Sequence, residues 1–508
     1  MKRNSIFKTG ESMKIINYMN FVRQCEPRSA DFEKAGELLF KTTVRQFEIA
    51  KKYGLPCTFL LQYDVLLDEK YINFFKENAD ENIELGLWYE IPKQLVDGVG
   101  LEWRGKDGWT WDWHIVPGFS MAYSKEERQL LIDSAMNKFK EVFGFFPKSV
   151  ASWLIDTHTV NRLSEKYGVD YIGICRDQTS TDAYTLIGGY FNGGYYPSKN
   201  NMFTPAQTSE NAQATPVFRL LGPDPVHNYD KEKYLSSPED AAVVYTLEPA
   251  WTTARREDVV KWYEKTYFEN ESLNFAYAQI GQENSFFEVG DKMLDALEMQ
   301  IKIFEENSEN RFLTTAQTGR LFKESFNSTP VSSVYASEDW SSGEKIQSLY
   351  YDSKKYAANI FRYENRIFLR SLYLFDESVK EKYFDSCCET FDAIYENLPV
   401  SDTLMWKDNS GLTLDMEAEK FEVEKIDGNC LSVSWKDCSV IFRENSVEIK
   451  NAAPVLDLTS AKVKTVIDGS RILFTKDSVC YAVHVEGARI EKTDSSIMFT
   501  GNDIKLCF

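Results

Sequence analysis

"KSVASWLIDTHT", residues 148–159, combines a short apolar run with an acid placed directly after it. Trp153, Leu154 and Ile155 are typical of a buried strand, and Asp156 follows at once. In a barrel of parallel strands, the carboxyl ends of the strands meet on one face, where active sites are built. The stretch therefore predicts a buried strand that delivers a carboxylate to a shared cleft.

Strand-like and helix-like stretches alternate around this segment, which is typical of α/β proteins with a parallel sheet. A capping box formed by Ser124 and Glu127 predicts the start of a helix that precedes the segment 148–159. We therefore predict an α/β fold, a distorted (β/α)7-type barrel over residues 1–330. The seven strands are expected at residues 14–22, 57–62, 82–89, 149–155, 170–175, 241–247 and 274–280.

From about Tyr335 the pattern changes to short alternating runs, such as "CLSVSW" and "DIKLCF", separated by Gly, Asp and Asn. These runs indicate an antiparallel β-sandwich. One segment with helical spacing, residues 378–398, interrupts them. We predict that residues 331–508 form a mainly β-sandwich domain with one helical segment. Its acids lie in turn-like positions, so we expect a supporting role for it.

The composition restricts the partners of the protein. A formal net charge of −20 argues against nucleic acid and against an anionic membrane surface. No apolar run is long enough to span a bilayer, and the start lacks the apolar segment of a signal peptide. Nine scattered cysteines without a CxxC motif are typical of free thiols in a reducing compartment. We therefore expect a cytoplasmic protein without nucleic-acid or membrane partners; the sequence leaves the oligomeric state open.

Charged residues follow every predicted strand of the barrel. They are Arg23, Glu26 and Arg28 after the first strand, then Asp64, Glu90, Asp156, Arg176 with Asp177, Glu248 and Glu283. Crowded carboxyl groups push their pKa values apart, so that one acid is protonated beside an ionised neighbour. Glycoside hydrolysis requires such a pair. For any single acid the alternative is a role as a helix cap or as an ion-pair partner.

Two of these acids are predicted to be catalytic. Asp156 follows a buried strand directly, so its carboxylate is held rigidly, as a nucleophile requires. Glu283 follows Gly281, which permits a bend into the cleft, and is predicted to be the acid/base. Glu248, before Pro249, is the reserve candidate for the acid/base.

A loop rich in tryptophan, "WRGKDGWTWDWH" at 103–114, adds a predicted sugar-binding surface, because exposed aromatic rings beside polar groups suit a sugar subsite. We expect Trp111 in the cleft wall; the alternative is a loop that its tryptophans anchor to the barrel. A second rim loop is predicted at 188–201. The predicted substrate-binding residues are Glu26, Arg28, Asp64, Trp88, Glu90, Trp111, Asp112, His114, His158 and Asp177.

A metal site is the weaker alternative. The chain has four histidines and no HxxxH or HExxH motif. His114 and His158 could bind a divalent metal with nearby acids, but hydrogen bonding is the more common role of such residues. No cofactor is therefore expected.

Three stretches resemble polysaccharide deacetylases of the NodB type: "CTFLLQYD", "IELGLWYEI" and "EVFGFFPKSVASW". The resemblance covers residues 14–320 as an order of elements. It implies the same barrel and a metal-dependent deacetylase activity. The metal-binding aspartates and histidines of that family have no counterparts, since "RQCEPR" ends the first strand, and Trp88 and Pro92 stand where the histidine pair would fall.

An incomplete seven-stranded barrel followed by a β-rich domain also resembles glycoside hydrolase families 38 and 57. This resemblance implies a nucleophile after the fourth strand and an acid/base near the last strands, where Asp156 and Glu283 lie. The motifs "NFVRQCEPR" and "WLID" further resemble an uncharacterised bacterial group that is often considered glycosidase-like.

The sequence therefore predicts a carbohydrate-active hydrolase, a glycoside hydrolase with paired carboxylates at the carboxyl rim of the barrel and a carbohydrate substrate. The alternatives are a metal-dependent sugar deacetylase with unusual ligands and a non-catalytic glycan-binding protein. Loss of activity with a chelator would distinguish the metal-dependent deacetylase from the glycoside hydrolase. Glycan binding without turnover would distinguish the non-catalytic glycan-binding protein from both enzymes.

Overall fold

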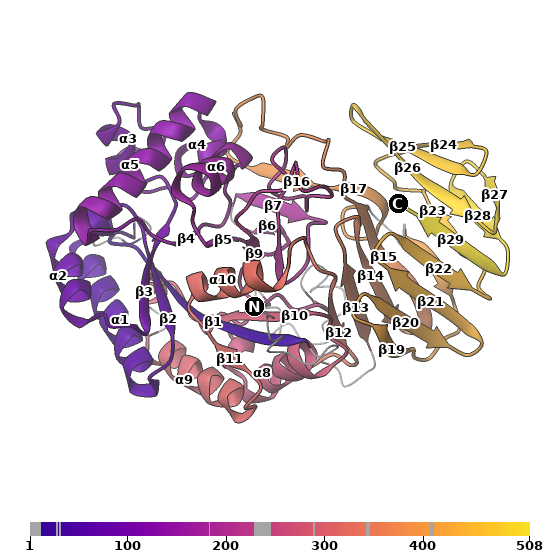
Figure 1. Ribbon diagram of the computed structural model, residues 1–508, viewed down its shortest axis with the longest axis horizontal. Helices are drawn as coiled ribbons and strands as arrows, with labels where there is room; N and C mark the ends of the chain where they lie inside the picture. The colour runs from indigo at the N-terminus through magenta and orange to yellow at the C-terminus, as the bar shows by residue number, and fades with distance from the viewer. Residues whose placement is uncertain are drawn as a thin grey trace, which may run out of the picture.

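The computed structural model describes residues 12–26, 29, 32–181, 183–227, 245–287, 290–341, 346–406 and 411–508. An α/β barrel forms the amino-terminal part, and two antiparallel sheets form the carboxyl-terminal part beside it (Figure 1). Within the described chain, no helix has the length and apolar character needed to cross a membrane. All nine cysteines are free thiols.

The barrel sheet contains seven parallel strands among the described residues, in the order β10-β1-β2-β3-β4-β5-β9. The strands are β1 (Met13–Val22), β2 (Cys57–Leu61), β3 (Ile83–Trp88), β4 (Ser149–Ala151), β5 (Tyr171–Ile174), β9 (Val217–Arg219) and β10 (Phe275–Ile280). Two short strands extend this sheet: β8 (Gly194–Tyr195) pairs antiparallel with β9, and β11 (Arg311–Phe312) pairs parallel with β1. β10 and β9 are the first and last of the seven parallel strands, and no described ladder joins them. The barrel is therefore nearly closed, with an open seam between these two strands.

The sixth parallel strand differs from the prediction. It is β9, at 217–219, and not the predicted segment at 241–247. In the described part of that segment Thr246 forms only an isolated bridge with Pro223, and residues 241–244 lie outside the described residues. A three-residue strand is too short to show a hydrophobic period, which is why the sequence pattern missed β9.

Helices cover the outside of the barrel sheet (Figure 1). The predicted capping box is confirmed, because Ser124 and Glu127 exchange both hydrogen bonds at the start of α5, which ends at Gly144. The α-helices of the barrel are α1 (Phe32–Tyr53), α2 (Glu69–Asn78), α3 (Lys93–Gly98), α4 (Ile115–Gly118), α5 (Lys125–Phe143), α6 (Thr157–Arg162), α8 (Glu257–Glu264), α9 (Asp291–Glu306) and α10 (Thr315–Ser325).

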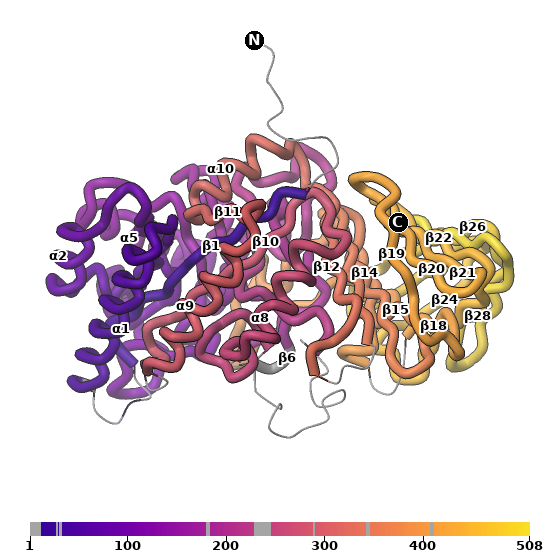
Figure 2. Tube along the Cα trace, turned by 90° about the horizontal axis from the view of Figure 1, so that it is seen from below, coloured from indigo at the N-terminus to yellow at the C-terminus, as the bar shows by residue number. Residues whose placement is uncertain are grey.

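Helix α10 closes the amino-terminal end of the barrel, beside β11 and the start of β1 (Figure 2). The Thr315 backbone N–H donates to Thr58 Oγ1 at 3.0 Å, and the Ala316 N–H donates to Glu84 Oε2 at 2.9 Å. Thr58 and Glu84 lie in the first two positions of β2 and β3. The opposite end, where the strands finish, is the end at which parallel barrels form their sites.

The carboxyl-terminal part contains two antiparallel sheets that share one hydrophobic core. The first sheet is formed by β12 (Ser332–Ala336), β13 (Gln347–Asp352), β14 (Tyr356–Tyr363), β15 (Arg366–Leu374), β17 (Leu398–Asp402), β18 (Leu412–Asp415), β23 (Val455–Asp457), β27 (Arg489–Lys492) and β28 (Ser496–Thr500). The second sheet is formed by β19 (Glu422–Asp427), β20 (Cys430–Trp435), β21 (Cys438–Arg443), β22 (Ser446–Lys450), β24 (Lys464–Asp468), β25 (Arg471–Lys476), β26 (Val479–Glu486) and β29 (Asp503–Cys507). The antiparallel character predicted for this region is therefore present.

The first sheet also packs against the barrel. Tyr350 and Phe361 belong to the core of the barrel, whereas Leu349 and Ile360 belong to the core between the two sheets. Successive side chains of a strand point to opposite faces, so these strands are buried on both sides. The carboxyl-terminal part thus completes the packing of the barrel.

The predicted helix at 378–398 is wrong. Turns and bends occupy most of this segment, and β16 (Ala393–Glu396) then pairs with β7 (Tyr184–Ile187) of the barrel part, in a small sheet with β6 (Gln178–Thr181). Arg128 of α5 donates hydrogen bonds to two backbone carbonyls of the segment. These contacts with the barrel satisfy the backbone in place of helical hydrogen bonds. We call residues 376–398 the crossing segment.

Candidate active site

A buried arginine joins the carboxyl ends of three strands. Arg23 follows β1, Glu90 lies two residues after β3, and Glu283 lies three residues after β10. Arg23 Nε and Nη2 donate to the two oxygens of Glu90 at 2.9 and 2.8 Å, and Nη1 forms an ion pair with Glu283. Arg23 and Glu90 are 1% exposed, and Glu283 is 5% exposed. Burial lowers the pKa of Arg23, but the charges of Glu283 and Glu90 outweigh this effect and raise the pKa well above its usual value.

Neutral side chains hold this cluster in place. Gln62, which follows β2, donates to Glu90 Oε2 at 2.6 Å. The side chain of Asn284 accepts from the Arg23 backbone N–H at 3.0 Å and donates to the Arg23 carbonyl at 2.8 Å. The charged groups are therefore fixed before a substrate arrives, as catalysis by preorganised charges requires.

A third acid, Glu248, is buried and interacts electrostatically with Glu283. Burial, followed by the charge of Glu283, raises the pKa of Glu248 to about 7. Trp251 Nε1 donates to Glu248 Oε2 at 3.1 Å, and Gln282 Nε2 donates to Oε1 at 3.2 Å. A carboxyl group with a pKa near neutrality suits general acid catalysis.

Asp64 and Glu26 extend the cluster on the side of β1 and β2. Burial raises the pKa of Asp64 to about 7, although the backbone N–H groups of Gln24 and Val65 donate to its carboxylate at 3.1 and 2.7 Å. Glu26 is 5% exposed, and its charge acts on Arg23. Arg28 lies outside the described residues.

The tryptophan-rich loop reaches the strand ends. The Trp111 ring lies over the Arg23 guanidinium, 4.4 Å from ring centroid to Cζ, and Trp111 is 3% exposed. Its indole N–H is buried and has no acceptor among the described residues. Asp112 Oδ1 accepts from the His114 backbone N–H at 3.1 Å and lies 2.7 Å from Nδ1 of the His114 imidazole. Trp111 thus borders the charged cluster, and Asp112 fixes the imidazole of His114.

Asp156 has different surroundings. It caps α6, accepting from the Thr159 N–H at 3.2 Å and from Thr159 Oγ1 at 2.5 Å. Ser120 and Arg128 also donate to its carboxylate, which is fully buried. No described hydrogen bond or ion pair connects it with Glu248 or Glu283. The predicted fourth strand at 149–155 is shorter in the structure: β4 ends at Ala151, so Asp156 caps α6 and does not follow the strand directly. Its carboxylate is saturated with structural hydrogen bonds.

The remaining predicted substrate-binding residues make contacts within the protein. Trp88 is fully buried and stacks on Phe21 at 4.2 Å. His158 Nε2 lies 2.8 Å from the carbonyl oxygen of Phe384 in the crossing segment. Asp177 is ion-paired with Arg219. The predicted rim loop at 188–201 is buried over most of its length, and Phe191 stacks on Tyr350 of the first carboxyl-terminal sheet at 3.6 Å.

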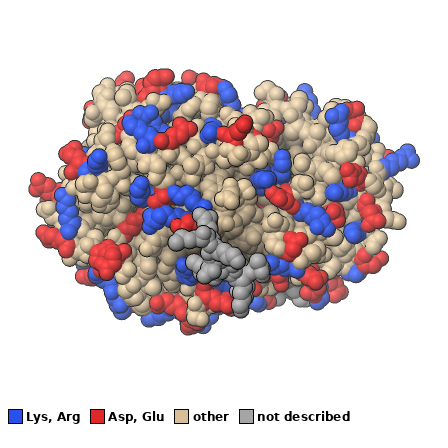
Figure 3. Space-filling model, in the orientation of Figure 1, with Lys and Arg blue, Asp and Glu red and all other residues tan. Residues whose placement is uncertain are grey.

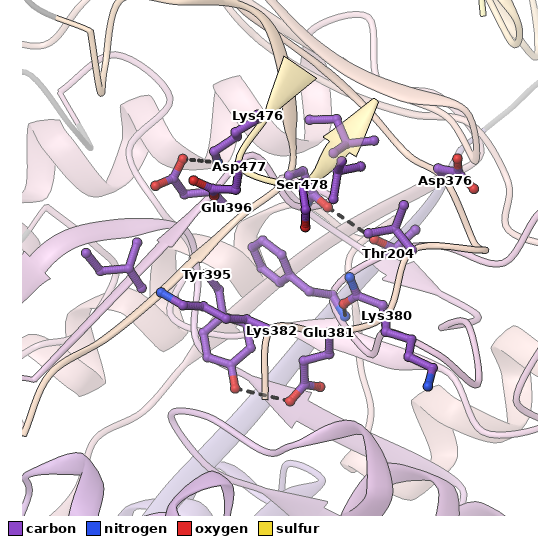
Figure 4. Close-up of a pocket in the computed structure, with 17 residues that line it drawn as sticks. Thr204, Asp376, Lys380, Glu381, Lys382, Tyr395, Glu396, Lys476, Asp477 and Ser478 are labelled. Atoms are coloured by element: carbon purple, nitrogen blue, oxygen red, sulfur yellow. Dashed lines mark hydrogen bonds and ion pairs between the residues drawn. The ribbon is translucent and has the colours of Figure 1, made fainter. Parts of the chain in front are cut away.

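A pocket of about 370 Å³ lies between the barrel, the crossing segment and the β25–β26 turn (Figure 4). Tyr395 donates to Glu381 at 3.2 Å at one end, and Lys476 is ion-paired with Glu396 at the other. Burial, followed by the charge of Asp156, raises the pKa of Glu381 to about 7. None of the three acids Glu90, Glu248 and Glu283 lines this pocket, so it is separate from the charged cluster.

The sequence patterns missed the neutral members of the cluster. Gln62, Gln282 and Trp251 hold its carboxyl groups, and Arg23 supplies the basic group that contacts both Glu90 and Glu283. The available signal was an amide one or two positions before an acid at the end of two strands, in "LLQYD" and "IGQEN". Such an amide supplies a donor that orients a buried carboxyl group.

Gly281 controls the direction in which Glu283 leaves β10. Its φ is +110°, and a Cβ atom there would lie 2.0 Å from the Met19 carbonyl oxygen of the neighbouring strand. Gly281→Ala is expected to reduce the free energy of unfolding by roughly 3 kcal/mol or more, from strain and overpacking together. Gly54→Ala is the matched control, because φ there is +64° and nothing lies within 4 Å of the added atom. It should cost about 1 kcal/mol. Urea unfolding of both variants checks this, and equal losses would contradict the close approach.

The cluster does not fit the divalent metal that the resemblance to NodB-type deacetylases implies. The Arg23 guanidinium already lies between two of its carboxylates and supplies the positive charge there. Across the described residues, no group of three or more His, Cys, Asp or Glu side chains could hold a metal ion.

No protein-family model and no curated protein matches this chain. Among solved structures it is similar to a "putative glycoside hydrolase/deacetylase" from Parabacteroides distasonis, with a TM-score of 0.55 and 13% identity over 80% of this chain and 94% of that one. It also matches a "putative polysaccharide deacetylase" from Mycobacterium smegmatis, with a TM-score of 0.34 and 13% identity over 62% of this chain and 94% of that one. The first likeness covers most of both chains and concerns the fold, a nearly closed α/β barrel with added antiparallel β-sheets.

Proposed function

We propose that this protein is a glycoside hydrolase that uses the carboxyl groups of Glu248 and Glu283. The observation that carries the proposal is the contrast between these two neighbouring acids. Glu283 is ion-paired with Arg23, whereas burial and the charge of Glu283 raise the pKa of Glu248 to about 7. Hydrolysis of a glycosidic bond requires one protonated and one ionised carboxyl group on either side of that bond.

In this proposal Glu248 protonates the leaving oxygen, and Glu283 supplies the charged group that acts at the anomeric carbon. Arg23 and Glu90 hold Glu283 in position. The buried indole N–H of Trp111, which has no acceptor within the described chain, donates to a sugar hydroxyl. The shared fold with a glycoside hydrolase/deacetylase-type structure supports a carbohydrate as the substrate.

Asp156, the nucleophile expected from the sequence, is assigned a structural role in this proposal. Its carboxylate already accepts from Ser120, Arg128 and Thr159, and it lies under the crossing segment, where Glu381 binds the neighbouring Thr157. A nucleophile needs an oxygen that faces the substrate. The more specific resemblance to glycoside hydrolase families 38 and 57 stays a prediction.

The proposal is tested with a panel of 4-nitrophenyl α- and β-glycosides. At least one should be hydrolysed, and kcat/KM should fall as the pH rises through about 7, because Glu248 must be protonated to act as the acid. Glu248→Gln should remove this descending limb while retaining turnover of substrates with good leaving groups. Release of acetate from an acetylated sugar that EDTA abolishes would instead support the deacetylase alternative. Glycan binding without turnover of any substrate would support the non-catalytic one.

A further inference from the structure

A row of aromatic rings leads away from the charged cluster towards solvent. It starts at Trp111 over Arg23 and continues to Trp113, with ring centroids 6.3 Å apart. Trp113 stacks on His114 at 5.1 Å, and His114 contacts Phe391 at 5.3 Å. Trp109 lies beside Trp113 at 5.1 Å. Each ring thus touches the next from the cluster outwards.

Exposure increases along this row. Trp111 is 3% exposed, the His114 side chain is 37% exposed, and Phe391 is 60% exposed. Phe391 is among the most exposed large apolar residues in the described chain. Trp109 and Trp113 are half-buried. A row of partly exposed aromatic rings leaves apolar surface in water, which suits a surface that a ligand covers.

Two separate parts of the chain build this surface and fix its position. Trp109 to His114 belong to the loop between α3 and α4, whereas Phe391 belongs to the crossing segment. The Ile115 backbone N–H donates to the Phe391 carbonyl at 2.9 Å, and this bond anchors the crossing segment at the loop. Asp112 holds the His114 imidazole through Nδ1. The rings are therefore set in place without a ligand, which lowers the entropic cost of binding.

We propose that Trp109, Trp113, His114 and Phe391 form an aromatic platform that binds the extended part of a glycan chain whose end enters the charged cluster. The substrate class is accordingly an oligosaccharide or polysaccharide. The platform is continuous with Trp111, and through it with Arg23 and Glu283, so this inference rests on the proposed function.

The chemistry of the platform favours a glycan over other ligands. A pyranose ring has an apolar face that stacks on aromatic side chains, and its hydroxyl groups remain in water or bind nearby polar groups. A polymeric chain repeats this face, which matches successive rings. The net charge of −20 disfavours nucleic acid, the other common polymer that stacks on aromatic side chains.

The test is affinity electrophoresis of the full-length chain in native gels that contain xylan, mixed-linkage β-glucan, amylopectin or glycol chitosan. At least one polysaccharide should retard the wild type. Trp113→Ala and Phe391→Ala should each weaken the binding by roughly tenfold. Phe145→Ala is the matched control, because Phe145 is 49% exposed and contacts two other aromatic rings outside the platform. Trp113→Phe, which retains a ring, should keep more binding than Trp113→Ala.

Two results would overturn the platform. One is that none of the four polysaccharides retards the wild type. The other is retardation that Trp113→Ala and Phe391→Ala leave unchanged, or that Phe145→Ala reduces equally. The gel measures binding without turnover, so retarded polysaccharides that are not cleaved would contradict the proposed hydrolase and retain the platform. Cleavage of aryl glycosides without retardation by any polysaccharide would retain the proposed hydrolase and contradict the platform.

Discussion

Glu283→Gln is expected to lower kcat by roughly 10³-fold or more, because the amide retains the shape of the side chain and removes the charge that acts at the anomeric carbon. The fold should survive, since Arg23 keeps its two hydrogen bonds to Glu90. KM should change little, because the charge matters mainly in the transition state. Steady-state kinetics on an aryl glycoside that the wild type hydrolyses gives both values.

Two further variants make this test specific. Glu283→Ala opens space at the carboxylate position, so added formate or azide should restore part of the turnover if the missing function is a negative charge. Glu264→Gln is the matched control: Glu264 is 9% exposed and accepts from Asn307 and Asn310 on the outside of the barrel. It should retain turnover. Near wild-type kcat for Glu283→Gln would refute the assignment and direct attention to Asp64 and Glu90.

Arg23→Met should destabilise the protein by roughly 3–5 kcal/mol, because it leaves the carboxylates of Glu90 and Glu283 buried without a cation. Methionine fills a similar volume, so the loss measures charge more than packing. Urea unfolding at pH 7 gives the free energy of unfolding. Turnover should be lost as well, since Arg23 holds Glu283.

The control for this prediction is an arginine in a more exposed ion pair. Arg162 donates two hydrogen bonds to Asp133, and their side chains are 28% and 21% exposed. Water screens that pair, so Arg162→Met should cost about 1 kcal/mol or less. The double variant Arg23→Met/Glu90→Gln should be more stable than Arg23→Met alone, because one unpaired charge is removed. Equal losses for Arg23→Met and Arg162→Met would contradict the desolvated cluster.

Charged side chains on the surface contribute to stability differently from the buried charged side chains at the strand ends. Acidic and basic side chains are interspersed over the visible face of the molecule (Figure 3). Pairs such as Lys261 with Glu257 are more than half exposed, and such pairs contribute little to stability. The buried cluster of Arg23, Glu90 and Glu283 is costly to desolvate, and this cost is a reason to seek a function for it.

The sequence by itself determined the alternation of strands and helices in the barrel. The strands β1, β2, β3, β5 and β10 lie within two residues of their predicted ends, because each is a mainly apolar run that both faces of a parallel sheet bury. The helix α5 was found from its capping box and its terminal glycine, which are local signals. The acids at the strand ends were also visible, because their positions follow from the strand ends.

Only the tertiary structure decided which of those acids belong together. Asp156 and Glu283 look equivalent in sequence, yet Asp156 is saturated by Arg128 and Ser120, while Glu283 meets Arg23 from 260 positions away in the chain. The segment at 378–398 has helical spacing, but the barrel binds its backbone and β16 joins β7. The strand β9 is only three residues long and exists through its ladder with β5. In each case the deciding contacts join residues distant in the chain, and periodicity reports only on local ones.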